Sequence, residues 1–377
     1  MRTSTNRTHI QKLLESPHSL SRKSFLLVSL LFIASCSVGQ EPNSPTSDLS
    51  SSVINSSSSQ ALATSSEGDT KGCSEGEIYE LPEITYTCIK GEWTTQNGDK
   101  DKENTDTNTG KGQLSTFTLI HDNQTREYSL YLPASFDGRL SLPIMLNFHG
   151  FGGNMADQMI SANMRSLADT ANFILVYPQG TLMDGVSHWN ASLPSATNKS
   201  NADDLGFVNA LINEIVLKHQ ADSTRVYASG YSNGGFMSHG LACHLSDKIA
   251  AIVGVSGTMI DIANCAPTHK TAMMAIHGTS DGTVPYEGGN GFSSLNETME
   301  FWINYNKTNP TAVVEKFDDK GTAIEHHSYL DDKGDALVQH YKVIEGNHIW
   351  FNFNINGYST NRLIWDFVSQ WDINGKI

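Results

Sequence analysis

The fold is decided by the stretch Arg225-Val226-Tyr227-Ala228-Ser229-Gly230-Tyr231-Ser232-Asn233-Gly234-Gly235. Its first residues are β-branched and aromatic, as in a strand, and the apolar residues after it have helical spacing. Gly230 and Gly234 lack a Cβ, so the chain can turn sharply and hold Ser232 in a strained conformation. A helix that begins here points its first N–H groups at any anion formed near Ser232. The stretch therefore predicts a strand, a tight turn that presents a serine, and a helix.

A serine hydroxyl is a weak nucleophile at neutral pH, so it needs a base, a group that orients the base, and donors for the oxyanion. Asp281 lies just beyond a predicted strand at 271–276, where a carboxylate can accept an imidazole N–H. The alternative is an Asp that merely forms a turn before Gly282. We expect Asp281 to be the orienting acid.

The base must come from the 14 histidines of the chain. His348 lies between the last predicted strand and the last predicted helix, which is where this chain order of serine, acid and histidine places the base. His277 ends a strand and is expected in the core, His326 and His327 lie in a charged segment that looks exposed, and His340 is inside a strand. We therefore predict His348 as the base, with His340 as the weaker candidate.

A glycine-rich loop, Phe148-His149-Gly150-Phe151-Gly152-Gly153-Asn154, follows an early predicted strand. Glycines let main-chain N–H groups approach a substrate closely. We predict that the backbone N–H groups of Phe151 and Asn233 hold the oxyanion. The loop lacks the remaining features of a dinucleotide or nucleotide-phosphate motif.

Strands and helices alternate from residue 113 to the end of the chain. A mostly parallel sheet with helices on both faces follows, with an antiparallel hairpin at its start, and this is the α/β-hydrolase fold. The hairpin is expected around Asp122-Asn123. Further strands are expected at 143–148, 173–177, 225–229, 249–255, 271–276 and near 338–344, and helices at 155–171, 205–216 (capped by Asp203 and Asp204), 294–305 and 360–371.

The first 36 residues indicate export. Arg22 and Lys23 precede a short apolar run that is too short to span a bilayer, as in a signal peptide. Ile33-Ala34-Ser35-Cys36 resembles a bacterial lipobox, which implies that Cys36 is lipidated and that the mature protein is anchored at the outer membrane or cell surface; an ordinary secretory signal is the alternative. We expect a Ser-rich linker at 37–72, a small module at 73–93, a polar linker at 94–112 and the catalytic domain at 113–377.

The other four cysteines are Cys73, Cys88, Cys243 and Cys265. Export permits disulfides, and the short separations favour Cys73–Cys88 and Cys243–Cys265, although four cysteines allow three connectivities. The module at 73–93 is either a stapled spacer or a small sugar-binding unit that presents Trp93. No spacing typical of a metal site is present, so we expect no metal and no cofactor.

The net charge of −15 argues against binding of nucleic acid, or of anionic lipid by charge alone. We expect contact with a membrane only through the lipid anchor, and a monomer.

The motifs resemble the secreted polyhydroxybutyrate depolymerase and feruloyl esterase family, which includes acetylxylan esterases. The resemblance spans most of 113–377, and its motifs are His149 to Asn154, Asp203 to Phe207, Arg225 to Gly235, His277 to Tyr286 and Gly346 to Trp350. It implies Ser232 as nucleophile, Asp281 as orienting acid, His348 as base and a Cys243–Cys265 disulfide. It also suggests that Trp189 lines or caps the acyl pocket. Two departures are Phe351 and Gly282, where the family often has Pro.

The sequence thus predicts a cofactor-independent serine carboxylic ester hydrolase. Its expected substrate is an ester linked to plant cell-wall polysaccharide or a hydroxyalkanoate oligomer, and Trp189, Tyr231 and Trp350 are the expected pocket residues. The alternatives are a surface glycan-binding lipoprotein with a non-catalytic hydrolase scaffold, and a serine peptidase of the same fold.

Overall fold

The computed structural model describes three strands between residues 78 and 95, and residues 112–377 apart from 196, 197, 199 and 290. The three strands, β1 (Ile78–Leu81), β2 (Ile84–Ile89) and β3 (Glu92–Thr95), form an antiparallel sheet in which β2 pairs with both β1 and β3. The predicted lipidation of Cys36, the linkers, the Cys73–Cys88 disulfide and the side chain of Trp93 lie outside the described residues.

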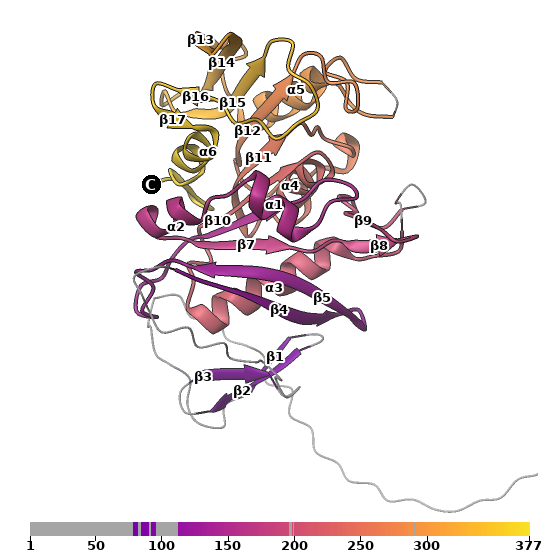
Figure 1. Cartoon of the computed structure of the whole chain (residues 1–377), viewed down its shortest axis with the longest axis vertical. Coiled ribbons are helices and arrows are strands. Elements are labelled where there is room, and N and C mark those ends of the chain that lie inside the picture. Colours follow the sequence, from indigo (N-terminus) through magenta and orange to yellow (C-terminus); the bar gives the residue numbers. More distant parts are fainter. Residues whose placement is uncertain are drawn as a thin grey trace, which may run out of the picture. The chain divides into compact units, whose positions relative to one another are not determined.

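Ten strands of the catalytic domain form one sheet in the order β13-β14-β15-β12-β11-β10-β6-β7-β5-β4 (Figure 1). The strands from β15 to β7 in this order pair in parallel. Antiparallel pairs extend the sheet at both edges. The strands are β4 (Gln113–His121), β5 (Gln124–Leu132), β6 (Ile144–Phe148), β7 (Ile174–Pro178), β10 (Val226–Tyr231), β11 (Ile249–Val255), β12 (Ala272–Gly278), β13 (Val313–Asp319), β14 (Thr322–Leu330) and β15 (Ala336–Val343).

Helices flank this sheet (Figure 1). Every residue of β6, β7, β11 and β12 is buried. Because successive side chains of a strand point to opposite faces, both faces must be covered, as the sequence predicts. The helices are α1 (Met155–Ser161), α2 (Arg165–Ala171), α3 (Asp204–His219), α4 (Asn233–His244), α5 (Leu295–Asn306) and α6 (Thr360–Val368), with a short 3-10 turn η1 (Ile262–Asn264).

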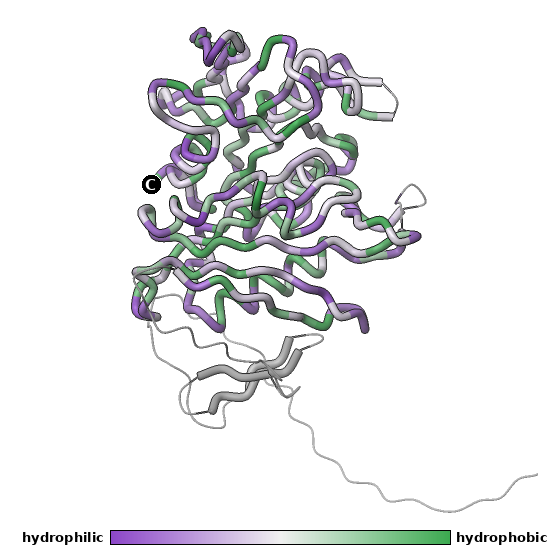
Figure 2. The backbone as a smooth tube through the Cα atoms, viewed as in Figure 1, coloured by the Kyte–Doolittle hydropathy of each residue, from purple (hydrophilic) through white to green (hydrophobic). Residues whose placement is uncertain are grey.

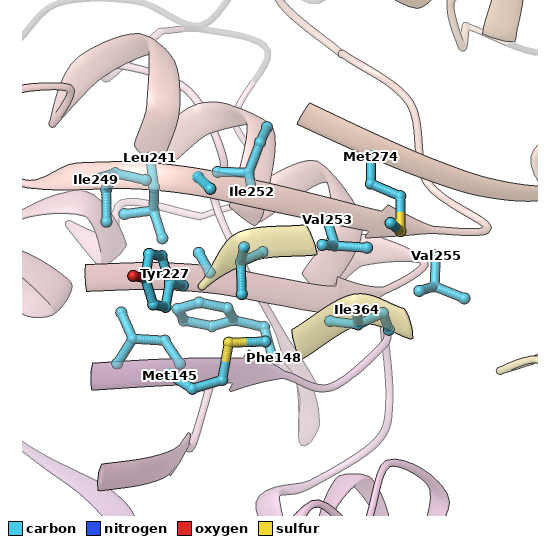
Figure 3. Packing of buried hydrophobic residues seen from close by; sticks show 14 of the residues in the cluster. Met145, Phe148, Tyr227, Leu241, Ile249, Ile252, Val253, Val255, Met274 and Ile364 are labelled. Atoms are coloured by element: carbon cyan, nitrogen blue, oxygen red, sulfur yellow. The ribbon is translucent and has the colours of Figure 1, made fainter. Parts of the chain in front are cut away.

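The apolar core follows these central strands. The hydrophobic stretches of the tube in Figure 2 concentrate along them. In the close view of Figure 3, Phe148 and Met145 from β6 lie near Tyr227 from β10 and Ile364 from α6. All four side chains are nearly inaccessible to solvent. The core therefore fixes the ends of the strands, where the loops of the site begin.

The expected hairpin is present, and Asp122 and Asn123 both have positive φ (48° and 56°), as a two-residue β-hairpin turn requires. The capping prediction for α3 is confirmed for Asp203, whose side chain accepts from the N–H of Gly206. Asp204 instead lies in the first turn and forms a buried ion pair with Arg126, at 2.6 Å between Oδ1 and Nη2.

The prediction of one helix over 155–171 is wrong, because α1 ends at Ser161 and α2 begins at Arg165. The hydroxyl of Tyr177 donates to the carbonyl of Ala162 at 2.8 Å and accepts from the N–H of Met164 at 3.4 Å. A buried side chain from β7 thus supplies the hydrogen bonds that an unbroken helix would have made. Periodicity alone carries no sign of this interruption.

Several strands were not predicted. They are the antiparallel pair β13–β14 at the second edge, and the short hairpins β8 (Thr181–Met183) with β9 (Val186–His188), β16 (Asn354–Ile355) with β17 (Tyr358–Ser359) and β18 (Trp371–Asp372) with β19 (Gly375–Lys376). The last hairpin ends α6 at Val368, three residues before the predicted end.

The Cys243–Cys265 disulfide implied by the family resemblance is present, and it ties the end of α4 to the turn after η1. Among the described helices, none combines the length and the apolar character needed to cross a membrane.

Candidate active site

The turn between β10 and α4 is as sharp as the sequence predicts. Ser232 has φ 55° and ψ −115°, a strained conformation for a residue with a side chain. A Cβ on Gly230 would lie 2.2 Å from the carbonyl oxygen of Gly234, and a Cβ on Gly234 would lie 2.2 Å from that of Phe148. Both glycines are therefore required by collisions with backbone atoms. They let the turn close so that Ser232 is presented at the start of α4.

Ser232, His348 and Asp281 come together at the carboxyl ends of β10, β15 and β12. Ser232 Oγ lies 2.9 Å from His348 Nε2, and His348 Nδ1 lies 2.7 Å from Asp281 Oδ2. A carboxylate only accepts hydrogen bonds, so Nδ1 carries the proton and Nε2 is left as the acceptor for the serine hydroxyl. The predicted residues thus stand in the order nucleophile, base and orienting acid.

The carboxylate of Asp281 is fully buried and surrounded by donors. Oδ1 accepts from the N–H groups of Thr283 at 2.9 Å and Val284 at 2.8 Å, and His277 Nε2 lies 3.3 Å from Oδ2. Burial alone would raise the pKa of Asp281, but the hydrogen bonds from His277, His348 and the two N–H groups outweigh it. The pKa of Asp281 is therefore held well below its usual value, and the carboxylate is charged at neutral pH.

His277 is the residue of this group that sequence analysis assigned only to the core. It is inaccessible to solvent, as expected, but its Nε2 faces both Asp281 and the carbonyl oxygen of Val284, at 2.9 Å from the latter. Its position four residues before Asp281, at the end of β12, is the signal that could have identified this contact. His340, the weaker candidate base, is buried beside the rings of Tyr286 and His327.

The loop that carries His348 is fixed by side chains from two other strands. Tyr231 donates its hydroxyl to the carbonyl of His348 at 2.9 Å, and the two rings lie 5.1 Å apart. Ser256, just after β11, donates to the carbonyl of Ile349 at 2.9 Å. The exposed fraction is 15% for the side chain of His348 and 0% for that of Asp281. Two hydrogen bonds thus hold the loop of His348 while its imidazole remains partly accessible to solvent, and the carboxylate of Asp281 is fully buried.

The glycine-rich loop lies directly against the nucleophile. A Cβ on Gly150 would lie 2.9 Å from a ring carbon of Tyr231 and 3.4 Å from Cβ of Ser232, so the absence of a side chain allows this approach. The N–H of Gly152 donates to the carbonyl of Ser187 at 2.8 Å, which ties the loop to β9. Phe151 lies between Gly150 and Gly152 in the chain and is half-exposed. Asn233 opens α4, where first-turn N–H groups have no intrahelical acceptor.

The three expected pocket residues lie in different surroundings. Tyr231 is half-buried beside His348, whereas Trp189 and Trp350 are 1% and 7% exposed. Trp189 makes hydrogen bonds to His149 of the glycine-rich loop and to Asn233, the residue after Ser232, and its contact with a substrate stays a prediction. Of the two departures from the family pattern, Phe351 is buried against the loop at Gly346 and Gly282 is exposed, with open space around its Cα.

Comparison with known proteins identifies the domain. The family model described as esterase PHB depolymerase matches residues 126–284, which include Ser232 and Asp281. This segment of the chain is therefore similar to that family of esterases. It is 27% identical over 261 residues to the bifunctional acetylxylan esterase/xylanase XynS20E of Neocallimastix patriciarum, covering 67% of this chain and 34% of that protein. It is 26% identical over 261 residues to feruloyl esterase B of Piromyces equi, covering 66% of this chain and 46% of that protein.

The chain thus spans between a third and a half of the length of those two relatives. A probable feruloyl esterase C from Aspergillus clavatus is 30% identical over 176 residues, covering 46% of this chain and 61% of that protein. The structure of an acetyl xylan esterase from Aspergillus awamori superposes with a TM-score of 0.51 at 15% identity, covering 68% of this chain and 99% of that chain. This structural likeness confirms the α/β-hydrolase fold.

Proposed function

We propose that the chain is a carboxylic ester hydrolase that works through an acyl-enzyme formed on Ser232. The observation that carries the proposal is the unbroken chain of hydrogen bonds from Ser232 Oγ through His348 to Asp281, at 2.9 and 2.7 Å. The match of residues 126–284 to an esterase family model supports the same reaction. A non-catalytic scaffold would have no need of this arrangement.

In the first half-reaction Ser232 Oγ attacks the ester carbonyl carbon while His348 Nε2 takes the hydroxyl proton. Asp281 stabilises the imidazolium that forms. The N–H groups of Phe151 and Asn233 hold the oxyanion, and each such donor contributes about 3 kcal/mol to the stability of the transition state. His348 then gives its proton to the leaving alkoxide, and the acyl group remains on Ser232.

In the second half-reaction water takes the place of the alcohol. His348 removes a proton from the water as it attacks the acyl carbon, and the proton returns to Ser232 Oγ when the carboxylic acid leaves. None of these steps requires a metal or an organic cofactor.

For the substrate we propose an ester linked to plant cell-wall polysaccharide, with a hydroxyalkanoate oligomer as the second class. The names of the relatives, acetylxylan esterase and feruloyl esterase, support the first class. We also propose a monomer, anchored outside the cytoplasm through a lipid on Cys36. Retention of Cys36→Ala in the membrane fraction, or wild-type protein without an attached lipid by mass spectrometry, would contradict the anchor.

The test of the reaction is Ser232→Ala, with Ser229→Ala as the matched control. Ser229 is a fully buried residue of β10, the strand that leads to Ser232, and its hydroxyl makes no hydrogen bond among the described residues. Release of p-nitrophenol from a short acyl ester should vanish in Ser232→Ala and persist in Ser229→Ala. Equal turnover by wild type and Ser232→Ala would refute the proposal. Methyl ferulate, acetylated xylan and hydroxybutyrate oligomers would then separate the substrate classes.

A further inference from the structure

Trp189, directly after β9, holds the start of the glycine-rich loop. Its indole Nε1 donates to the carbonyl of His149 at 3.0 Å. Its ring packs edge-on against Phe148, with centroids 5.2 Å apart, and lies 5.1 Å from the ring of His149. Only 1% of Trp189 is exposed, so water does not compete for the indole hydrogen bond. The tryptophan therefore fixes the main chain two residues before Phe151.

The main chain of Trp189 is also paired in both directions with the side chain of Asn233. The N–H of Trp189 donates to Asn233 Oδ1 at 2.7 Å, and Asn233 Nδ2 donates to the carbonyl of Trp189 at 3.0 Å. Asn233 is 2% exposed, so water does not compete for these bonds. The residue that follows the nucleophile is thereby tied to the same tryptophan as the glycine-rich loop.

Neighbouring contacts keep this segment from moving. The N–H of Asn190 donates to Asp204 Oδ2 at 2.7 Å, and Asp204 is paired with Arg126 in the buried ion pair described above. On the other side of Trp189, the hydroxyl of Ser187 donates to the carbonyl of Gly153. The residues around Trp189 are thus held by hydrogen bonds that lead to α3, β5 and the glycine-rich loop.

We propose that Trp189 and Asn233 form a clamp that sets the separation of the two N–H donors of the oxyanion hole. One donor, Phe151, lies on the loop that the indole holds, and the other is the N–H of Asn233 itself. Donors stabilise a transition state only if they are fixed before charge develops, and a misplacement of about 1 Å can lower a rate by about 100-fold. In this role Trp189 is a positioning residue that acts through His149 and Asn233, not a pocket wall.

The clamp rests on the proposed ester hydrolysis, and the test separates the two. Trp189→Phe keeps an aromatic ring but removes the indole donor, and Asn233→Ala removes both side-chain bonds while keeping its own N–H. The matched control is Trp302→Phe. Trp302 is equally buried, and its indole donates at 3.1 Å to His239 instead of to the loop. Each variant is compared with wild type for kcat and KM on a p-nitrophenyl ester, for binding of a phenylboronic acid, and for melting temperature.

We expect kcat to fall roughly 10- to 100-fold in Trp189→Phe and in Asn233→Ala, with KM little changed. The boronate forms a tetrahedral adduct on a serine, so its affinity should fall in parallel with kcat/KM. The double variant should be no worse than about the poorer single variant, since both break one clamp. Trp302→Phe should lose comparable stability but keep kcat near the wild-type value.

Two results would overturn the clamp while leaving the proposed function intact. The first is an active wild type whose Trp189→Phe and Asn233→Ala variants match Trp302→Phe in kcat. The second is a rise in KM with kcat unchanged, which is the result expected if Trp189 is a wall of the substrate pocket. A wild type that neither hydrolyses the ester nor binds the boronate would overturn the proposed function and the clamp with it. If Trp189→Phe does not fold, Asn233→Ala decides between the same outcomes.

Discussion

Replacing Asp281 by Asn should disable the base without displacing it. Oδ1 of Asp281 accepts from the N–H groups of Thr283 and Val284, at 2.9 and 2.8 Å. Both donors need an acceptor, so the amide oxygen of the asparagine must occupy this position. The amide NH2 then replaces Oδ2, which lies 2.7 Å from His348 Nδ1. An NH2 group can only donate there, so His348 must present a lone pair at Nδ1.

A neutral imidazole with a lone pair on Nδ1 carries its proton on Nε2. His348 would then donate toward Ser232 Oγ, at the present separation of 2.9 Å, and would no longer accept the hydroxyl proton. Loss of the base through this change of tautomer lowers kcat by about 10⁴-fold in serine hydrolases that use the same three groups, which is about 5.5 kcal/mol in the activation free energy. We expect a fall of this size, with KM changed little.

The assay is hydrolysis of a short p-nitrophenyl ester at neutral pH, with Asp169→Asn as control. Asp169 also accepts from one main-chain N–H and one side chain, the hydroxyl of Tyr131, both at 2.8 Å. Its partners are Tyr131 and Ala134, neither of which belongs to the three catalytic groups, so its variant should keep the wild-type rate. A folded Asp281→Asn enzyme within about tenfold of the wild-type kcat would show that Asp281 does not set the tautomer of His348.

Three further predictions concern stability. Gly230→Ala should destabilise the fold by about 3 kcal/mol or more, since its Cβ would lie 2.2 Å from the carbonyl of Gly234, and an unchanged melting temperature would contradict this. Reducing Cys243–Cys265, which are 22 residues apart, should lower the free energy of unfolding by about 3 kcal/mol, measured by urea denaturation with and without reductant. Burial lowers the pKa of His340 well below its usual value, so its contribution to stability is present above about pH 6.5 and is lost as the pH falls below it, by up to about 1.4 kcal/mol per pH unit. His340→Leu should reduce this pH dependence, and a urea series that finds the same slope would count against it.

The parts of the site that the sequence predicted are those encoded by short local patterns. A glycine on each side of Tyr231-Ser232-Asn233 after a β-branched run requires a sharp turn, and the structure shows the backbone collisions that enforce it. Asp281 and His348 were identifiable because each lies in the loop after a strand of a parallel sheet, so chain order already determined which edge they share. The central strands were predicted within one or two residues for the same reason.

The parts that were missed depend on contacts between distant segments. Nothing near Ala162 signals that Tyr177, from a later strand, interrupts the helix there. The strands β13 and β14 are largely exposed or half-buried, so they lack the apolar runs that identified the central strands. The buried bonds of Trp189 to His149 and Asn233 were also missed, because they depend on a three-dimensional arrangement that has no local sequence pattern.

The sheet order explains why the base needs support from strands that it does not follow. The order β15-β12-β11-β10 places two strands between the end of β15, where the loop of His348 begins, and the end of β10, where Ser232 stands. This loop must cross the ends of β12 and β11 to bring an imidazole within 2.9 Å of the serine. Tyr231 from β10 donates to the carbonyl of His348, and Ser256, just after β11, donates to the carbonyl of Ile349. These two hydrogen bonds fix the loop at the point where it reaches Ser232. The acid needs no such support, because Asp281 lies only three residues after the end of β12 and accepts hydrogen bonds from N–H groups of its own turn. The position of His348 is therefore more sensitive to distant substitutions than that of Asp281, since it depends on the hydroxyl groups of Tyr231 and Ser256, which take no part in the chemistry.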